Sequence, residues 1–168
     1  MSATQIVSRR DLAFLLDEIL DVDFLLQRPR FAEHNRALFD SVLDTAERLA
    51  IERFAPHYRR SDEPEPRWDG KTVSIMPEVK AALDAFSASG FMAMRTELAD
   101  GGMQLPETIV QTVMAIFMSA NIATSAYAML TQAAANLVAT FAAPQQRFLW
   151  LQPMLDGRCF GTMALTEP

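Results

Sequence analysis

The sequence is poor in the residues that hold metals and disulfides, with one cysteine and two histidines among its 168 residues. The single Cys159 excludes an internal disulfide and fits a protein of the reducing cytoplasm. We interpret it as a small, buried apolar residue, because no base is placed to activate the thiol. His34 and His57 lie far apart and in no Glu-x-x-His or His-x-x-x-His frame. We therefore expect no metal site and two exposed surface histidines.

Positive charge is also scarce. The formal net charge is −6, and the basic residues form no long stripe, which argues against a nucleic-acid-binding surface. Residues 108–146 carry no charge at all, yet Gln111, Thr112, Gln132 and Asn136 interrupt this apolar stretch. A membrane span needs about 20 mainly apolar residues. We therefore predict no membrane span, but helices that are buried on most of their faces. We also expect no signal peptide, since acidic residues interrupt the apolar run at the N-terminus.

What is present is typical of a helical domain. Half of the residues are hydrophobic and about a fifth are charged, and the length suffices for one domain with a sizeable core. Apolar residues recur at helical spacing along most of the chain. Proline, glycine and asparagine mark the breaks. The predicted helices cover residues 9–26, 31–54 and 78–89, two helices between 108 and 141 that break at 119–121, and a last helix over 144–155.

Two loops separate these predicted helices. Residues 68–71 (Trp-Asp-Gly-Lys) indicate a turn followed by a short extended stretch. Residues 99–106 form a glycine loop before a helix, a position that favours phosphate binding in some proteins. No lysine and no Gly-x-Gly-x-x-Gly frame accompany this loop, so phosphate binding is the less favoured interpretation.

The last residues carry a different pattern. From Phe160 to Thr166 the side chains alternate in character, which predicts a strand that leaves a helix after Gly157. Pro168 holds Glu167 extended and cannot donate to a ladder. We predict two parts, an N-terminal helical domain over residues 1–157 and the first strand of a further β-domain over residues 158–168. The chain shows no Gly-x-Ser-x-Gly elbow and no isolated carboxylate in an apolar run, so it offers no catalytic acid or base.

This terminal segment, Gly-Thr-Met-Ala-Leu-Thr-Glu-Pro over residues 161–168, resembles the flavin-contacting segment of the acyl-CoA dehydrogenases. The order of features upstream is similar too: the Gly101-Gly102 loop, two uncharged helices, and Pro-Gln-Gln-Arg at 144–147. Residues 10–18 and 68–71 resemble the longer subgroup that includes 3-methylmercaptopropionyl-CoA dehydrogenases. Met103 and Gln104 depart from the usual glycine-containing loop, so we expect that turn to differ locally.

The resemblance implies a fold and an activity. The fold is an all-α helical bundle, like the N-terminal domain of the family, that ends in the first strand of a β-domain. The activity is FAD-dependent α,β-desaturation of an acyl-CoA thioester, with electrons passed to an electron-transferring flavoprotein, in a homo-oligomer. The glutamate base belongs to the C-terminal part of the family's fold, so no catalytic residue is assigned here.

The resemblance also implies two groups of site residues. Met163, Ala164, Leu165 and Thr166 would contact the flavin, with Thr166 donating to its N5/O4 edge. Met129, Gln132 and Ala133 would lie near the acyl tail, although ordinary helix packing explains them equally well.

Two alternatives use the same helices differently. The chain could be a non-catalytic helical interaction module derived from this family, which binds a partner through its uncharged helices. A DNA-associated variant of the family is disfavoured by the acidic charge balance.

Overall fold

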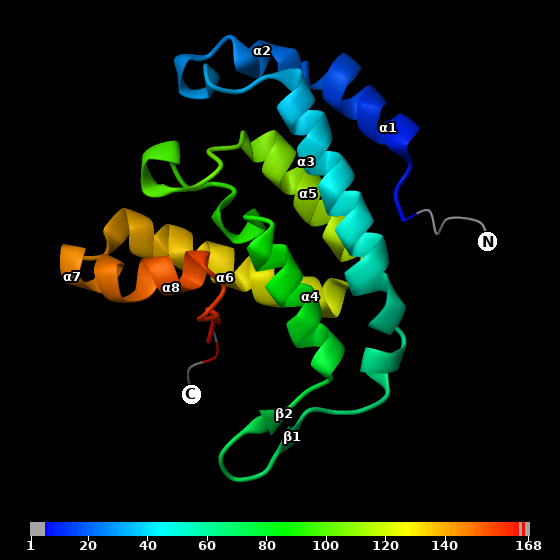
Figure 1. Ribbon diagram of the computed structural model, residues 1–168, viewed down its shortest axis with the longest axis vertical. Coiled ribbons are helices and arrows are strands. Elements are labelled where there is room, and N and C mark those ends of the chain that lie inside the picture. The colour runs from blue at the N-terminus through cyan, green and yellow to red at the C-terminus, as the bar shows by residue number, and fades with distance from the viewer. Residues whose placement is uncertain (1–5, 165, 167–168) are drawn as a thin grey trace.

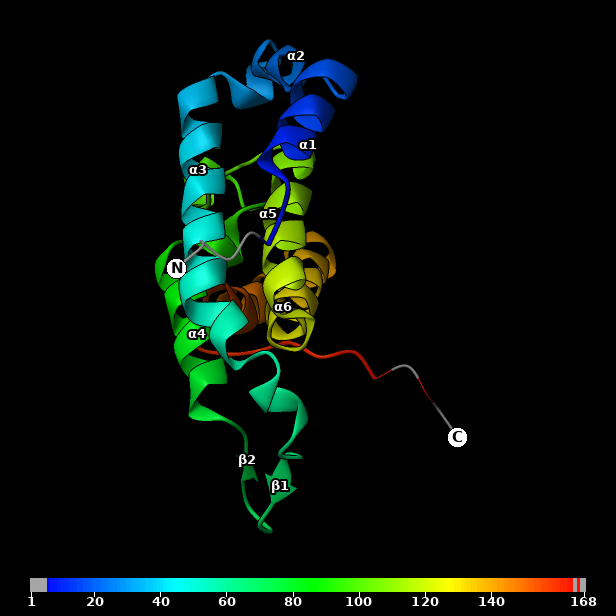
Figure 2. The same cartoon turned by 90° about the vertical axis from the view of Figure 1, so that its right-hand side faces the viewer.

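The computed structural model describes residues 6–164 and 166, and Figure 1 shows them as an elongated assembly of helices. Helices α3 and α5 lie side by side, and α6 crosses beneath α4. The short helices α1 and α2 cover one end, and a small hairpin projects from the other (Figures 1 and 2). The α-helices are α1 (Arg9–Ala13), α2 (Val22–Leu26), α3 (Arg36–Leu49), α4 (Pro77–Ala88), α5 (Glu107–Ala120), α6 (Ile122–Phe141), α7 (Pro144–Gln146) and α8 (Gln152–Leu155). The bundle confirms the predicted all-helical fold class.

Shorter turns of other helix types connect them. Three π-helical segments continue α-helices: Phe14–Ile19 after α1, Ala50–Phe54 after α3, and Arg147–Leu151 between α7 and α8. The 3₁₀ turns are Pro29–Phe31, Ala55–His57, Arg60–Asp62, Phe91–Ala93 and Leu98–Asp100. None of the helices in the described part of the chain is both long and apolar enough to cross a membrane.

The N-terminal helix is shorter than predicted. Residues 9–26 were expected to form one helix, but the chain breaks at Asp21, which adopts the left-handed conformation with φ 45°. The break turns α2 across the end of the bundle, so that Leu16 and Val22 are buried while Ile19 and Leu20 stay exposed. Helical spacing alone could not locate this break, because aspartate is one of the few residues besides glycine that tolerate this conformation.

Helix α3 begins later than predicted, at Arg36 instead of residue 31. The side chain of Asn35 accepts a hydrogen bond from Leu38 N at 2.9 Å and so caps the helix. This start sets the buried face, on which Phe39, Val42 and Ala46 point inward, whereas Leu38 is exposed. The helical spacing of the sequence predicts that Leu38 also points inward, and the structure corrects this.

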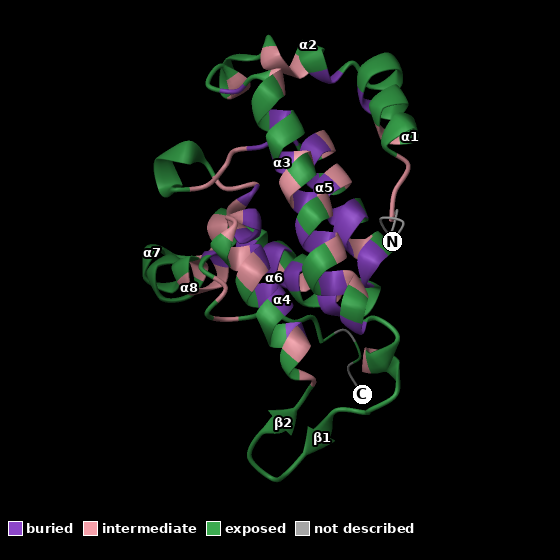
Figure 3. Ribbon diagram, turned by 45° about the vertical axis from the view of Figure 1, so that its right-hand side comes forward, coloured by how far each residue is buried: buried purple, intermediate pink, exposed green. Residues whose placement is uncertain are grey.

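Four phenylalanines form the centre of the core. Phe54, Phe86, Phe91 and Phe117 are each at most 1% exposed and come from four different segments. Their rings meet at centroid distances of 4.7–5.6 Å in tilted and edge-on pairs along the chain of contacts from Phe54 through Phe117 and Phe86 to Phe91. Such pairs add about 0.5–1.5 kcal/mol each beyond the burial of their area. The cluster therefore packs α4 and α5 against the π-helical segment after α3, which carries Phe54, and the 3₁₀ turn after α4, which carries Phe91. Figure 3 shows the buried residues of these helices in purple.

Both histidines are buried, which corrects the expectation of surface histidines. His57 is 1% exposed, and its Nε2 lies 2.8 Å from Thr124 Oγ1. His34 packs against the rings of Phe31 and Phe39, and its Nε2 lies 2.8 Å from the carbonyl of Met103. Each histidine bridges segments about 70 residues apart in the sequence. The missing metal-ligand spacing argues only against a metal site. It does not indicate whether a histidine is buried or exposed.

The predicted breaks before and after α4 and between α5 and α6 are confirmed. Pro77 opens α4, and Gly90 follows it with φ 78°, the left-handed conformation that glycine adopts without strain. Asn121 caps α6 by accepting a hydrogen bond from Thr124 N at 3.0 Å, and its amide also donates to the carbonyl of Phe54. The cap therefore fixes α6 to the core as well as starting it.

The strands differ from the prediction. Residues 68–71 do form a turn, in which Asp69 Oδ1 accepts from Lys71 N and Thr72 N. This turn joins β1 (Arg67–Trp68) to β2 (Val73–Ser74) in an antiparallel hairpin that the sequence did not indicate. Conversely, residues 160–164 and 166 form no strand in this structure. A strand is defined by its ladder of hydrogen bonds, and no second strand lies beside this segment among the described residues.

The last helical segment confirms its predicted range, and most of its large apolar side chains are exposed. Leu155 is buried, whereas Phe148 is 84% exposed and Leu149 and Trp150 are also exposed. The π-helical turn over Arg147–Leu151 displaces the side chains from the spacing of an α-helix. Phe141, the last residue of α6, is exposed as well.

Candidate functional site

A cavity of about 310 Å³ opens beside helices α5 and α6. Its wall is formed by three methionines, an alanine and four polar side chains: Met114, Met118, Met129, Ala133, Arg95, Gln111, Gln132 and Asn136. We call it the methionine cavity. The structure thus brings the three predicted acyl-tail residues, Met129, Gln132 and Ala133, to one cavity. Its volume is at the lower end of the range for small-molecule sites.

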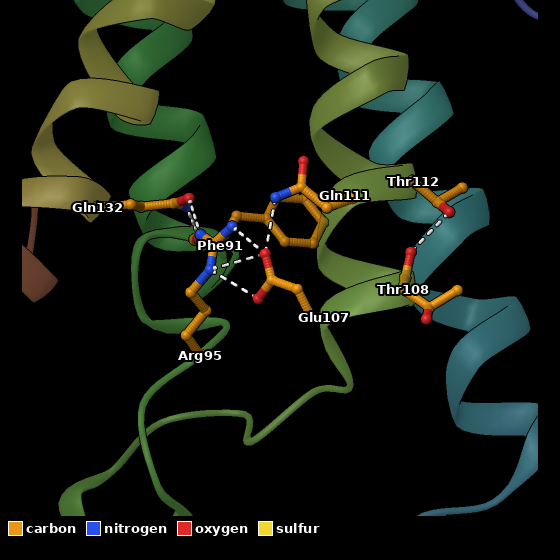
Figure 4. A network of polar contacts seen from close by, with 7 residues as sticks. All are labelled: Phe91, Arg95, Glu107, Thr108, Gln111, Thr112 and Gln132. Carbon is orange, nitrogen blue, oxygen red and sulfur yellow. Dashed lines mark hydrogen bonds and ion pairs between the residues drawn. The ribbon is translucent and has the colours of Figure 1, made fainter. Parts of the chain in front are cut away.

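A polar network closes one side of this cavity (Figure 4). The guanidinium of Arg95 donates from Nε and Nη2 to the carboxylate of Glu107, at 2.9 and 2.7 Å. Its Nη1 donates to Gln132 Oε1 at 2.6 Å, and Gln111 Nε2 donates to Glu107 at 2.7 Å. The hydrogen bonds from Arg95 hold the pKa of Glu107 below its usual value. The positive charge of Arg95 and the negative charge of Glu107 therefore balance within the network.

Local structure fixes this network in place. Gln132 is buried and donates from Nε2 to the carbonyl of Phe91 at 2.7 Å, so its amide cannot rotate without losing a buried hydrogen bond. Glu107 is the first residue of α5, where the helix dipole favours a carboxylate. Arg95 follows the buried Phe91, Met92 and Met94. A cation directly after a buried apolar run was the signal that our sequence analysis missed.

The glycine loop does not present free amides. The backbone N–H groups of Gly102, Met103, Gln104 and Leu105 donate to protein carbonyls at 2.8–3.1 Å. A phosphate site needs such groups to point at the ligand, so the loop geometry disfavours phosphate binding. Gln104 has φ 47°, a conformation that favours glycine, at the place where Met103 and Gln104 depart from the usual glycine-containing loop.

The segment predicted to contact flavin leaves the bundle in two steps. Gly157 has φ 70°, and a Cβ atom there would overlap Ser87 Oγ on α4. The chain then crosses α6, where Gly161 N donates to Thr131 Oγ1 at 3.1 Å and the ring of Phe160 meets Tyr127 edge-on. Thr131 directly precedes Gln132, so the segment crosses α6 beside one of the predicted acyl-tail residues before it reaches the predicted flavin-contacting residues.

Beyond Gly161 the segment turns outward. Thr162, Met163, Ala164 and Thr166 are exposed, whereas Leu165 lies outside the described residues. Cys159 is half-buried and outside any strand, not buried on one as expected, and its N–H donates to the carbonyl of Pro153. The exposed residues offer side chains and backbone groups to a ligand without first breaking contacts.

Catalytic groups are lacking at the methionine cavity. No carboxylate, histidine or cysteine is part of its wall among the described residues. The nearest carboxylate of the network, Glu107, is held ionised by Arg95. The buried His57 contacts Thr124 in the first turn of α6, whereas Gln132 lies further along this helix. Within the described part of the chain, no three His, Cys, Asp or Glu side chains are grouped as a metal site.

A comparison with known protein families identifies the region that contains these helices and the glycine loop. Residues 39–158 match the acyl-CoA dehydrogenase N-terminal domain. The chain belongs to the acyl-CoA dehydrogenase family. The matched region starts within α3 and ends directly after Gly157, so it contains the methionine cavity and the Arg95 network.

Two relatives extend the match over more of the chain. A 3-methylmercaptopropionyl-CoA dehydrogenase from Ruegeria pomeroyi is 27% identical over 128 residues, or 76% of this chain and 22% of the relative. The broad-specificity linear acyl-CoA dehydrogenase FadE5 from Mycobacterium tuberculosis is 30% identical over 161 residues, or 95% of this chain and 26% of the relative. The chain therefore spans about a quarter of the length of these acyl-CoA dehydrogenases. The resemblance drawn from the sequence, including the longer subgroup, is confirmed.

Proposed function

We propose that this chain forms the acyl-binding helical domain of an FAD-dependent acyl-CoA dehydrogenase that desaturates an acyl-CoA thioester between its α and β carbons. The observation that carries the proposal is the common cavity of Met129, Gln132 and Ala133 on α6. The methionine and alanine side chains give half of the wall an apolar and adaptable surface of the kind that suits a hydrocarbon tail.

In this proposal the chain's own residues bind and orient the substrate. The cavity withdraws the acyl tail from water, which contributes about 0.8 kcal/mol for each buried CH₂ group. Fixing the tail positions the reacting carbons at the other end of the acyl group. The reacting carbons lie at the other end of the acyl group from this cavity, so the base that removes the proton from the α carbon is not one of the residues of the cavity.

The described residues would form only a part of the cofactor site. Bound FAD would supply the acceptor for the hydride from the β carbon. Met163, Ala164, Leu165 and Thr166 would border one edge of the flavin, and the described members of this group are exposed and free to do so. Thr166 would donate from its backbone N–H or its hydroxyl. An electron-transferring flavoprotein as the acceptor, and a homo-oligomeric assembly, complete the proposed function.

The test is titration of the chain with octanoyl-CoA by calorimetry, with a matched pair of variants. Ala133→Phe places a ring in the methionine cavity and should weaken binding at least tenfold. Ala123→Phe adds the same ring at an exposed position of α6 outside the cavity and should leave the affinity unchanged. Equal affinities in both variants would contradict the proposed acyl site.

Turnover provides a second readout. The chain mixed with FAD, octanoyl-CoA and an artificial electron acceptor should show no reduction above the protein-free rate, because its cavity has no base. Turnover that survives repurification would show that a base within this chain had been overlooked.

A further inference from the structure

A second cavity adjoins the methionine cavity. It has a volume of about 260 Å³ and lies between α6, α8 and the loop after α4. We call it the α6–α8 cavity. Its apolar wall includes Met92, Ala135, Ala139 and Leu151, and the other part of its wall is polar, with Glu97, Asp100 and Arg147 among the charged side chains. The two cavities share three residues, Arg95, Gln132 and Asn136. These shared residues therefore line both spaces and lie where the two cavities adjoin.

Arg95 is the largest of the three, and it is held on both sides. Glu107 binds two of its nitrogens, and Gln132 binds the third at 2.6 Å. Gln132 is itself anchored to the carbonyl of Phe91 on the far side (Figure 4). Contacts to a carboxylate and to a buried amide remove the freedom that a long side chain usually has. The guanidinium is thus a fixed part of the wall.

We infer that Arg95 is a partition that sets the maximal length of the acyl chain. The inference rests on the proposed function, since it takes the methionine cavity as the site of the acyl tail. A tail that grows past this cavity meets the guanidinium and would have to break its contacts with Glu107 and Gln132. Charge-assisted hydrogen bonds cost more to break than neutral ones. Chains that fill the methionine cavity are accepted, and longer chains gain nothing from their additional carbons.

The volumes give the scale of the effect. An engineered cavity of about 150 Å³ holds benzene, which has six carbons. On this scale the methionine cavity has room for about a dozen carbons, and the α6–α8 cavity would add space for about ten more. Each further methylene that is buried improves affinity about fourfold. Removing the partition should therefore change the preference between dodecanoyl and hexadecanoyl chains strongly.

The test compares Arg95→Ala with Arg95→Met. Both variants leave Glu107 and Gln132 without the guanidinium, but methionine keeps the bulk of the wall and alanine removes it. The chain and both variants are titrated by calorimetry with octanoyl-, dodecanoyl- and hexadecanoyl-CoA below their micelle concentrations. The native chain and Arg95→Met should bind dodecanoyl- and hexadecanoyl-CoA with similar affinity. Arg95→Ala should bind hexadecanoyl-CoA at least tenfold more tightly than dodecanoyl-CoA.

A further variant fills the space behind the partition. Ala139→Phe places a ring in the α6–α8 cavity, which no acyl chain reaches while Arg95 is present. It should leave the length preference of the native chain unchanged and cancel the gain in the Arg95→Ala background. Because this variant keeps the Arg95 network, it tests the partition even if Arg95→Ala folds poorly: a changed length preference in the otherwise native chain overturns the inference.

The outcomes separate the two proposals. Binding at no chain length would overturn the acyl site and the partition with it. Binding with the same length preference in the native chain and Arg95→Ala would overturn the partition alone. An equal gain for Arg95→Met and Arg95→Ala would also overturn it, because the effect would then come from the lost charge and not from the opened wall.

Discussion

His57 is the residue whose surroundings most clearly link pH to stability. Its burial lowers the pKa of the imidazole from the ordinary value of 6.5, and a hydrogen bond with the Arg53 backbone only partly opposes this. In the unfolded chain the imidazole takes up a proton as the pH falls through about 6.5, whereas the folded chain resists it. The free energy of unfolding should therefore decrease as the pH falls from 7.5 to 5.

His57→Gln should reduce this pH dependence. The amide can keep a hydrogen bond to Thr124 but does not titrate, so the slope between pH 7.5 and 5 should flatten. We expect a cost of about 1–2 kcal/mol at pH 7.5 from the altered buried hydrogen bond. Urea denaturation at a series of pH values measures both effects. An unchanged slope in the variant would assign the pH dependence to other groups.

Single residues also show where sequence reasoning reached its limit. The positions of Met129, Gln132 and Ala133 were inferred from a resemblance, and the structure brings them to one cavity. Arg95 was missed because its role depends on Glu107 and Gln132, which are 12 and 37 residues away. The burial of His34 and His57 likewise depends on distant partners, Met103 and Thr124. Local spacing carries no information about such contacts.

At the scale of elements, the glycines that follow α4 and α8 differ in the space around them. Gly90 after α4 and Gly157 after α8 both have left-handed φ values, 78° and 70°. A Cβ atom at Gly90 would meet only ordinary contacts with Met103, whereas one at Gly157 would overlap the Ser87 side chain. Gly90→Ala should therefore cost about 1–2 kcal/mol for the backbone conformation alone. Gly157→Ala should cost about 3 kcal/mol, because overpacking adds to this strain.

Urea denaturation of both alanine variants measures this difference. The Gly90 variant serves as the matched control for the backbone conformation. If the two variants lose the same stability, the segment after α8 is not pressed against α4 in solution.

The element boundaries that could be predicted are those with local signals. Pro77, Gly90, Asn121 and Pro144 stand at or beside helix ends, and each acts through its own backbone or side chain. The break at Asp21 and the π-helical turns had no such signal, because packing against the rest of the bundle decides them. The hairpin was missed for a similar reason, since its strands are only two residues each.

The whole molecule exposes more surface than its mass predicts. Its accessible area is 10935 Å², against about 8,300 Å² for a compact monomer of this mass. Part of the excess is apolar: Leu137, Phe141, Phe148, Leu149 and Trp150 are all more than half exposed. These five residues lie close together in the sequence, and large apolar patches rarely stay uncovered in a monomer. A neighbouring subunit or a further layer of the same protein would cover it, as would the partner of an interaction module.

The isolated chain should therefore bind a hydrophobic dye or self-associate. Phe141→Ser together with Phe148→Ser should reduce the dye signal by about half or more. Leu20→Ser, an exposed apolar position on the N-terminal segment, serves as the control and should change it little. A monodisperse monomer in light scattering that binds no dye would count against a covered face.

The β1–β2 hairpin divides the chain into two pieces that share one core. Residues 62–75 are all exposed, and the hairpin projects from the end of the bundle (Figure 2). Trypsin should therefore cut first after Arg67 or Lys71. Phe54 precedes this cut, whereas Phe86 and Phe117 follow it, and their rings remain packed together. We expect the nicked protein to elute as a single species that separates only in denaturant. The peptide connection between α3 and α4 is then needed to find the fold but not to keep it, and position 71 is a suitable place for new termini in a circularly permuted chain.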